Sequence, residues 1–189
     1  LCGALNIPTL MIKGFEADDV IGSMAKRCAG EGLDVYMVTP DKDYGQLIGD
    51  HIWQYKPGKS GSDNEIIGVR EICRKYGIDS PTQVIDMLTI CGDTADNVPG
   101  VKGIGEVGAG KLVARYGSVK GIYEHLDELT PRQKAQFEEA RDHIGLSQEL
   151  VTIKTDINVD VPTEEMKVNQ SYGPKLADLF EKYEFNSLS

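Results

Sequence analysis

The sequence predicts an α/β fold, in which a parallel sheet with flanking helices is followed by a mainly helical half. In the first 60 residues, short β-rich apolar runs alternate with stretches whose apolar residues recur at helical spacing. Strands that alternate with helices in this way favour a parallel sheet, because each helix carries the chain back across the sheet. Beyond a polar, glycine-rich stretch at residues 56–61, nearly every segment has helical spacing.

The first 60 residues are expected to form the α/β core. The segment EADDVIGSMAKRCAG has apolar residues on one helix face and ends at a glycine, which is typical of a helix end. The run LDVYMVT is apolar and rich in β-branched residues, which indicates a strand. The expected elements are a helix end at 1–5 with an exit turn at 6–8, a short buried strand at 10–12, a helix at 16–30, a strand at 33–39, a helix at 41–48 and a strand at 52–55.

Residues 61–189 are expected to form a helical region, which the loop at 56–61 separates from the core. Ser62 or Asp63 is predicted to cap a first helix that runs to about Tyr76. Residues 151–161 are the one extended segment expected here, with an edge strand at 156–159. The further expected helices lie at about 81–91, 105–116, 118–125, 131–140 and 173–183.

The charge of the chain is unevenly distributed. Twenty basic and thirty acidic residues give a net charge of −10, which on its own argues against a nucleic-acid partner. One short segment is the exception, because it carries Lys102, Lys111, Arg115 and Lys120 against the single acid Glu106. A locally basic segment therefore lies within an acidic protein.

Neither a membrane span nor a disulfide framework is expected. No apolar run approaches the roughly 18 residues of a transmembrane helix. The cysteines are widely spaced, with no CxxC pair and no histidine at ligand spacing: Cys2, Cys28, Cys73 and Cys91. We interpret them as reduced cysteines in or near the core of a cytosolic protein, rather than as zinc ligands or disulfides.

Three clusters of acidic residues lie where a predicted element meets a turn. The first two follow the strands expected at 10–12 and 33–39, so they should lie at the same edge of a parallel sheet. The third lies in the helical region. The clusters consist of Glu16, Asp18 and Asp19, of Asp41 and Asp43, and of Asp93 and Asp96. We expect their carboxylates to converge in one acidic pocket.

Crowded carboxylates are suited to holding Mg²⁺. Hydrolysis of a phosphodiester needs an activated water and neutralised charge on the attacking and leaving oxygens, and two Mg²⁺ ions about 4 Å apart provide both. A set of acids without histidine fits Mg²⁺ better than Zn²⁺. Each cluster also has a plainer interpretation, since acids favour helix N-termini, cap helices or bond their own turn. The neighbouring acids at 18–19 and 41–43 favour the metal site, because a cap needs no such like-charge repulsion.

A glycine-rich segment at residues 92–112, GDTADNVPGVKGIGEVGAGKL, is the most specific feature of the sequence. The GIG turn at 103–105 precedes a predicted helix, whose first N–H groups are unpaired and, with the helix dipole, form an anion site. We expect a phosphate of a DNA strand at this site, with Lys102 and Lys111 as added cations. A plain packing turn between two helices is the alternative.

Three stretches resemble, in the same order, signatures of the 5′ nuclease family: EADD at 16–19, TPDKD at 39–43 and the glycine-rich segment. The version in bacterial DNA polymerase I is more similar than the flap endonucleases of eukaryotes, because the chain lacks long insertions. The resemblance implies a PIN-like core, a helix–hairpin–helix motif (H3TH) at about 92–116, and two Mg²⁺ ions, or Mn²⁺ as a substitute, on all seven acids. It also implies a hairpin that grips duplex DNA, often around a K⁺ ion, with the contact residues Val101, Lys102, Gly103, Ile104, Gly105, Gly108 and Lys111.

The sequence departs from the family pattern in two places. Pro40 stands where relatives usually have glycine, and Tyr44-Gly45 replaces a more apolar pair, so the local turn is expected to differ. The family also begins with a strand that bears a further metal-binding Asp, followed by a helical arch with basic residues. We expect both to lie upstream of Leu1. The chain alone should therefore bind branched or duplex DNA but cleave it slowly or not at all.

The function implied is Mg²⁺-dependent 5′-3′ exonuclease or flap endonuclease activity in replication and repair. Its partner would be duplex DNA with a 5′ flap or 5′ end. A polymerase domain is expected in the same parent chain, and the location is the bacterial cytoplasm, at the nucleoid. Two other classes stay open. One is a non-catalytic, structure-specific DNA-binding module, and the other is a PIN-like ribonuclease, against which the hairpin argues.

Overall fold

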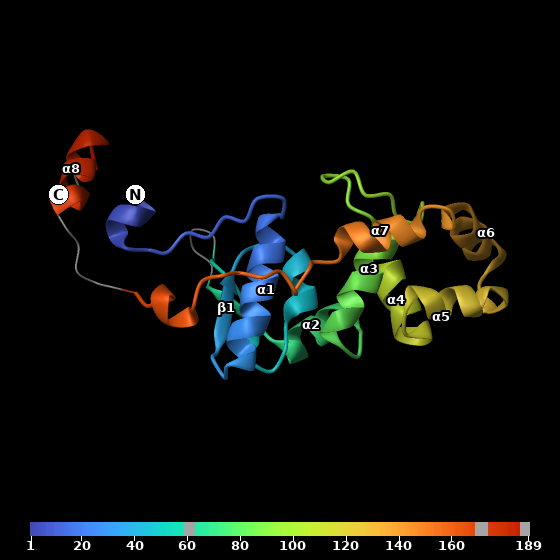
Figure 1. The fold of residues 1–189 in the computed structure, drawn as a ribbon. Coiled ribbons are helices and arrows are strands. Elements are labelled where there is room, and N and C mark those ends of the chain that lie inside the picture. Colours follow the sequence, from blue (N-terminus) through green and yellow to red (C-terminus); the bar gives the residue numbers. More distant parts are fainter. Residues whose placement is uncertain (59–62, 169–173, 186–189) are drawn as a thin grey trace.

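The structure, a computed structural model, describes residues 1–58, 63–168 and 174–185. They form an elongated molecule, in which an α/β part and a helical part lie side by side (Figure 1). Helix α1 (Ala17–Gly30) and a small sheet make up the α/β part, and confirm the helix expected at 16–30. Within the described ranges, no helix is long and apolar enough to cross a membrane.

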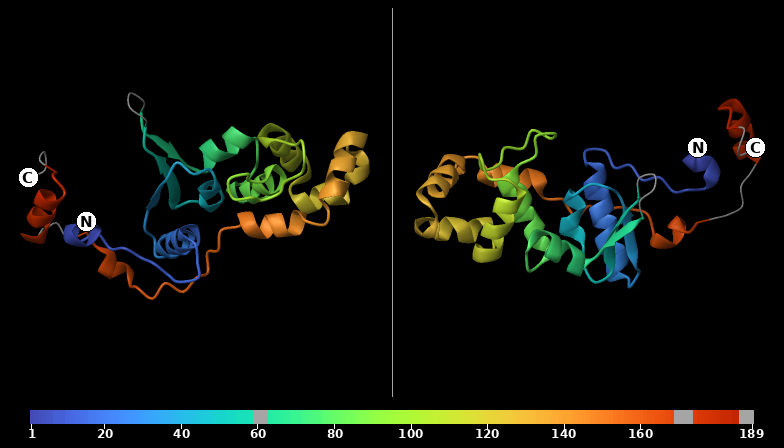
Figure 2. Two further views of the ribbon diagram at one scale, coloured as in Figure 1. Left: turned by 90° about the horizontal axis from the view of Figure 1, so that it is seen from above. Right: turned by 180° about the vertical axis from the view of Figure 1, so that it is seen from behind.

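The sheet has three strands, and helix α1 lies against one of its faces (Figure 2). In spatial order they are β1 (Val35–Val38), β2 (Ile52–Lys56) and β3 (Glu65–Ile67). The β1–β2 pair is parallel, which confirms the two strands expected in the core. The β2–β3 pair is antiparallel, with Gln54 opposite Ile67. The sheet is therefore mixed, because the antiparallel strand β3 was not expected beside the parallel pair.

The prediction of a helix starting at Ser62 or Asp63 was wrong. Ser62 lies outside the described residues, and β3 occupies residues 65–67 instead. Helix α2 (Val69–Tyr76) starts only after Gly68, whose N–H donates to the Glu71 carboxylate at 3.0 Å. A strand of three residues is too short to show a period of two, so the sequence pattern gave no sign of it.

Two further strands were predicted and do not form. Residues 10–12 are irregular, Met11 is 95% exposed, and no described strand pairs with the free edge of β1. Residues 156–159 are also irregular, and this segment runs along α1 instead of along the sheet. The Arg27 guanidinium of α1 donates to the carbonyls of Val159 at 2.7 Å and Val161 at 2.6 Å. A side chain of α1 therefore donates to carbonyls that would have paired with a neighbouring strand if residues 156–159 had joined a sheet.

The second half is helical, as expected. Among its described α-helices, α7 (Ile144–Val151) was not predicted. The helix expected at 173–183 is confirmed within the described residues, and Gly173 lies outside them. The other helices of this half are the 3₁₀ turn η3 (Pro81–Gln83), α3 (Val84–Cys91), α4 (Glu106–Tyr116), α5 (Val119–Glu124), the 3₁₀ turn η4 (Leu126–Glu128), α6 (Pro131–Ala140), the 3₁₀ turn η5 (Thr163–Met166) and α8 (Pro174–Lys182).

Helix α3 lies at the centre of the helical part. It contacts α4, α5 and α7, and on its other side it contacts the 3₁₀ helix η2 (Asp43–Leu47) of the α/β part. Its Thr89 and Ile90 are fully buried, and the Thr89 hydroxyl donates to the Ile85 carbonyl at 2.7 Å. One apolar core therefore runs from the sheet into the helices, and it fixes the C-terminal end of α3 relative to η2.

The two ends of the described chain lie together, away from the main body (Figure 1). The N-terminal 3₁₀ helix η1 (Cys2–Leu5) contacts α8 there. Asn6 follows η1 in a left-handed conformation, which agrees with the exit turn expected at 6–8.

Candidate metal centre and nucleic-acid interface

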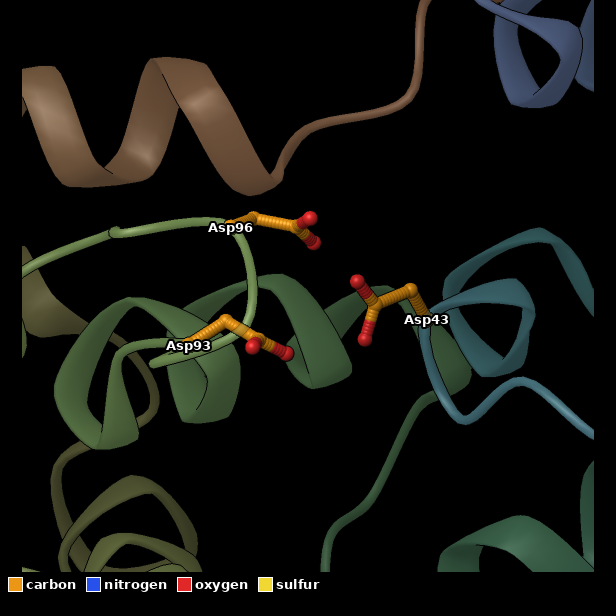
Figure 3. Close-up of side chains that lie close together, drawn as sticks. All are labelled: Asp43, Asp93 and Asp96. Carbon is orange, nitrogen blue, oxygen red and sulfur yellow. The ribbon is translucent and has the colours of Figure 1, made fainter.

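Three of the predicted acids converge, although they come from different parts of the chain. One carboxylate oxygen from each of Asp43, Asp93 and Asp96 lies within 4.8 Å of the others. Asp43 begins η2, whereas Asp93 and Asp96 lie in the loop that follows α3. Figure 3 shows the three carboxylates pointing toward one another across the gap between these elements. We call this group the three-acid cluster.

The loop that carries Asp93 and Asp96 is closed by its own backbone. The Asp93 N–H donates to the Val98 carbonyl at 3.0 Å, and the Val98 N–H donates back to Asp93 at 2.7 Å. The Asp93 carboxylate also accepts from the Ala95 N–H at 2.8 Å, and Asn97 takes the left-handed conformation that completes the turn. These bonds hold the two carboxylates on the same side of the loop.

Asp43 is the most perturbed acid of the cluster. Its carboxyl is half-buried, and its Oδ1 atom is buried with no hydrogen-bond partner among the described residues. Burial and the neighbouring Asp41 carboxylate raise the pKa of Asp43 to about 6, against the lowering effect of Lys42. A buried carboxylate oxygen without a donor is unfavourable unless a cation or another donor satisfies it.

Lys42 lies against the three-acid cluster and was not singled out by the sequence analysis. Its Nζ atom lies 3.1 Å from Asp93 Oδ2. Burial disfavours the charged ammonium, but the bond to Asp93 and the surrounding carboxylates outweigh this effect and raise the pKa of Lys42. The same bond lowers the pKa of Asp93. The signal in the sequence was the single cation between Asp41 and Asp43.

The other four predicted acids lie outside the three-acid cluster. Asp18 accepts from the Tyr44 hydroxyl at 2.7 Å, and Asp19 accepts from the Lys154 N–H at 2.9 Å. Asp41 accepts from the Asp43 N–H at 3.0 Å, and its charge also acts on Asp43. Glu16 is the N-cap of α1, and its side chain makes no capping bond.

Tyr44 connects the first acidic cluster to the second. It is buried directly after Asp43, and burial together with its hydrogen bond to Asp18 raises the pKa of the Tyr44 hydroxyl. The Asp41 and Asp43 carboxylates act on the same hydroxyl. Asp18 is thus coupled to the second cluster through a neutral donor. The turn at 39–41 is held by Gln54, whose amide donates to the Thr39 and Asp41 carbonyls.

The hairpin at 101–105 is anchored by its apolar residues. Val101 and Ile104 are buried, the Ile104 N–H donates to the Val101 carbonyl at 3.1 Å, and the Val101 N–H donates to Ile90 of α3 at 2.7 Å. Gly103 has a positive φ, which glycine adopts without strain. Because the two apolar side chains are inside, these residues could meet a ligand only through their backbone.

Helices α6 and α7 hold the same hairpin from outside. The Gln136 amide donates to the Lys102 carbonyl at 2.8 Å. The His143 ring lies 3.2 Å from the Gly100 carbonyl, and the Ser147 hydroxyl donates to the Pro99 carbonyl. The position of the exposed Lys102 is therefore set by segments far along the chain.

The four cations of the basic segment are not equivalent. Arg115 lies 2.9 Å from Glu128, and Lys120 lies 3.8 Å from Glu124, so both are already paired. Lys102 and Lys111 are exposed and form no ion pair with any described residue. Within the basic segment, the charge available to an anionic ligand therefore comes from these two lysines.

Comparison with known proteins places the fold and the family. Residues 1–77 match the family model described as 5′-3′ exonuclease, N-terminal resolvase-like domain, and residues 79–173 match 5′-3′ exonuclease, C-terminal SAM fold. A bacteriophage T5 protein co-crystallised with metal ions superposes with a TM-score of 0.64 and 25% identity, over 78% of this chain and 55% of that one. A T5 flap endonuclease complex with DNA and metal ions has a TM-score of 0.65 and 24% identity, over 93% and 60%. The boundary that we expect at about residue 60, between the α/β core and the helical region, stays a prediction.

Curated relatives agree with these matches. The chain is 35% identical to DNA polymerase I of Caldicellulosiruptor bescii, over 98% of this chain and 22% of the relative. It is 38% identical to DNA polymerase I of Pseudomonas aeruginosa, over 97% and 20%. The chain thus spans about a fifth of the length of these relatives. The resemblance stated from the three sequence motifs is confirmed: the chain belongs to the 5′-3′ exonuclease family.

Proposed function

We propose that this chain carries the metal-dependent nuclease site of a DNA polymerase I-like protein, which hydrolyses DNA phosphodiesters at or near a 5′ end. The observation that carries the proposal is the convergence of three carboxylates, one of which has a buried oxygen without a donor. The T5 neighbours, solved with metal ions and DNA, support it as well. A polymerase domain elsewhere in the parent chain and a place on the bacterial nucleoid are parts of the same proposal, and the DNA polymerase I relatives support the first of them.

The residues of the site fit hard divalent cations. The converging ligands are all carboxylate oxygens, which suits Mg²⁺ or its substitute Mn²⁺. Lys42 supplies one positive charge to three carboxylates, so negative charge is left for a cation. We propose that Asp43, Asp93 and Asp96 hold one ion, and that a second ion and its waters are held with Glu16, Asp18, Asp19 and Asp41. Asp18, Asp19 and Asp41 each use Oδ1 in a hydrogen bond, and their Oδ2 atoms are proposed as ligands.

Two bound ions would supply an activated water and would neutralise charge on the reacting phosphate. The protein residues would do the remaining work. Asp43 and Asp93 would fix the position of the ions, since η2 and the loop after α3 are packed on one core. Lys42 would set the charge of the site through its bond to Asp93. Burial around Asp43 and Tyr44 would limit the water that reaches these groups.

The hairpin is proposed to hold the duplex away from the site of cleavage. The exposed Lys102 and Gly103 and the first N–H groups of α4 would meet backbone phosphates. The α4 N-cap is Gly105, whose side chain cannot satisfy those N–H groups. A K⁺ ion at the hairpin is part of the same proposal.

Cleavage of a 5′-flap DNA tests the proposal. The assay uses the chain as printed and an upstream-extended form, with Mg²⁺ and with EDTA. We expect Mg²⁺-dependent release of the flap by the upstream-extended form, and slow or no release by the chain alone. In the extended form, Asp93→Asn and Asp43→Asn should each lose at least about 100-fold in rate. The exposed Asp142 offers a matched control, Asp142→Asn, which should keep its rate. Tight flap binding with no Mg²⁺-dependent cleavage in either form would instead favour a non-catalytic DNA-binding module.

A further inference from the structure

A groove between the last turn of α2 and one face of α4 is lined by three cationic side chains, Arg74, Lys75 and Lys111. The first two end α2, and Lys111 lies in the middle of α4. A Cβ on Gly110 would lie 2.6 Å from the Tyr76 carbonyl oxygen, so glycine permits this close approach of the helices. The packing of two helices distant in sequence therefore brings the cations together. We call this feature the α2–α4 groove.

The cations of the α2–α4 groove outnumber the acids beside them, although the Lys75 ammonium donates to the Tyr76 hydroxyl at 3.0 Å. Its three cations are exposed and form no ion pair with any described residue, whereas Arg115 and Lys120 nearby are paired with glutamates. Glu106 is the only acid that lines the groove. Three exposed cations beside one acid leave the groove locally positive within a chain whose net charge is −10, and this favours an anionic ligand.

The dipole of α2 explains only part of this grouping. Cations in the last turn of a helix gain about 0.3–1 kcal/mol from the carbonyl end of the dipole, which accounts for Arg74 and Lys75. Lys111 gains nothing in this way, because it lies mid-helix, and it is the residue that closes the groove from the other side. A separate reason is needed for the convergence of all three.

The α2–α4 groove is connected to the acids by shared lining residues. A small pocket beside it shares Tyr76 and Glu106 with the groove and also includes Lys42, which bonds Asp93. That pocket shares Cys91 with the hollow lined by Asp93 and the hairpin. The α2–α4 groove therefore lies close to the elements that carry the acids and the hairpin.

We propose that the α2–α4 groove binds backbone phosphates of DNA, as a second contact beyond the hairpin. The inference rests on the proposed function. It places Lys111 in one phosphate-binding site with Arg74 and Lys75, rather than in the site at the hairpin turn. The cations line an open groove and not a closed cavity, which suits successive phosphates of one strand. Free inorganic phosphate carries the same charged group and is the alternative ligand of the groove.

The salt dependence of DNA binding tests this assignment. The variant Arg74→Gln with Lys75→Gln removes two charges but keeps helix-forming side chains. The matched control, Lys120→Gln with Lys134→Gln, removes two charges that are already paired with acids. Affinity for a 5′-flap duplex is measured in EDTA between 50 and 200 mM salt, beside Lys102→Ala. Thermal unfolding with and without inorganic phosphate is measured on the same proteins.

Log affinity decreases with log salt, so the slope of this plot is negative. We expect the magnitude of the slope to decrease by about two in the groove variant and to stay unchanged in the control. The affinity ratio of wild type to variant should then shrink about 12-fold between 50 and 200 mM salt. An unchanged slope in the groove variant would overturn the inference. If Lys102→Ala still reduces the magnitude of the slope in that case, the proposed hairpin contact with phosphate stands although the groove inference fails. If the groove variant binds DNA as wild type does but its melting temperature no longer responds to inorganic phosphate, the groove binds free phosphate. That result would also overturn the inference.

Discussion

Gly92 and Gly100 face each other across the base of the loop that carries Asp93 and Asp96. A Cβ on Gly100 would lie 2.4 Å from the Gly92 nitrogen, and a Cβ on Gly92 would lie 2.5 Å from the Gly100 nitrogen. Both contacts are with backbone atoms, which cannot move aside as a flexible side chain can. The placement of the two carboxylates therefore depends on two glycines that carry no chemistry of their own.

Gly100→Ala should accordingly destabilise the protein and weaken its metal binding. Overpacking against backbone costs about 1–3 kcal/mol in free energy of unfolding, and relief of the clash would shift Asp93 and Asp96. Urea unfolding measures the first effect, and Mn²⁺ titration measures the second. Gly145→Ala in α7 is the control, because nothing lies within 4 Å of its Cβ. Equal unfolding midpoints for Gly100→Ala and wild type would contradict the close approach.

The raised pKa of Asp43 predicts a pH-dependent stability. Since the folded pKa is about 6 and the ordinary value is 3.8, the fold binds this proton more tightly than the unfolded chain does. The stabilisation from protonated Asp43 is therefore present below about pH 4 and is lost as pH rises through 6. In EDTA, Asp43→Asn should raise the free energy of unfolding by on the order of 1 kcal/mol at pH 8, because water partly screens the half-exposed carboxylate. Urea unfolding at pH 8 and 4 checks this, and a benefit confined to pH 4 would show the sign to be wrong.

Divalent metal should stabilise the folded chain. A ligand that binds only the folded state adds about 2.7 kcal/mol at 100 times its dissociation constant. We expect Mg²⁺ to raise the melting temperature of wild type and of the control Asp142→Asn. Asp93→Asn should lose most of this increase, because it removes a member of the three-acid cluster. The same Mg²⁺-induced increase in all three proteins would place the binding site elsewhere.

The hairpin lysine should contribute to binding without sequence preference. Lys102→Ala is expected to weaken binding to any duplex and to reduce the salt slope by about one, since the lysine would contact a phosphate. Arg115→Ala is the comparison, because that guanidinium is already paired with Glu128. Fluorescence anisotropy on two unrelated duplex sequences measures both effects. Loss of affinity for only one of the sequences would argue against a phosphate contact.

Much of the fold could be predicted because helix signals are local. Helix α1 has regular apolar spacing and ends at Gly30, and α4 follows a glycine turn. Helix α7 was missed because its buried face includes Ser147, a polar residue that breaks the apolar pattern. The strand predicted at 10–12 failed for a tertiary reason. An apolar run shows that a segment could be buried, but not that a ladder partner lies beside it.

The candidate site could be predicted in its residue types better than in its grouping. Motif order pointed to all seven acids, yet the structure brings only Asp43, Asp93 and Asp96 within ligand distance of one another. The role of Lys42 and the association of Lys111 with α2 depend on how separate helices pack, which spacing along one segment does not reveal. Both became visible only with the tertiary structure.

Counting bound metal ions tests the central claim most directly. Mn²⁺ binding to the chain, followed by electron paramagnetic resonance, should show two ions in wild type. It should show at most one in Asp43→Asn with Asp93→Asn, because that variant removes two of the three converging carboxylates. If the double variant binds two Mn²⁺ ions as wild type does, or if wild type binds no Mn²⁺ specifically, a metal centre at these acids is contradicted.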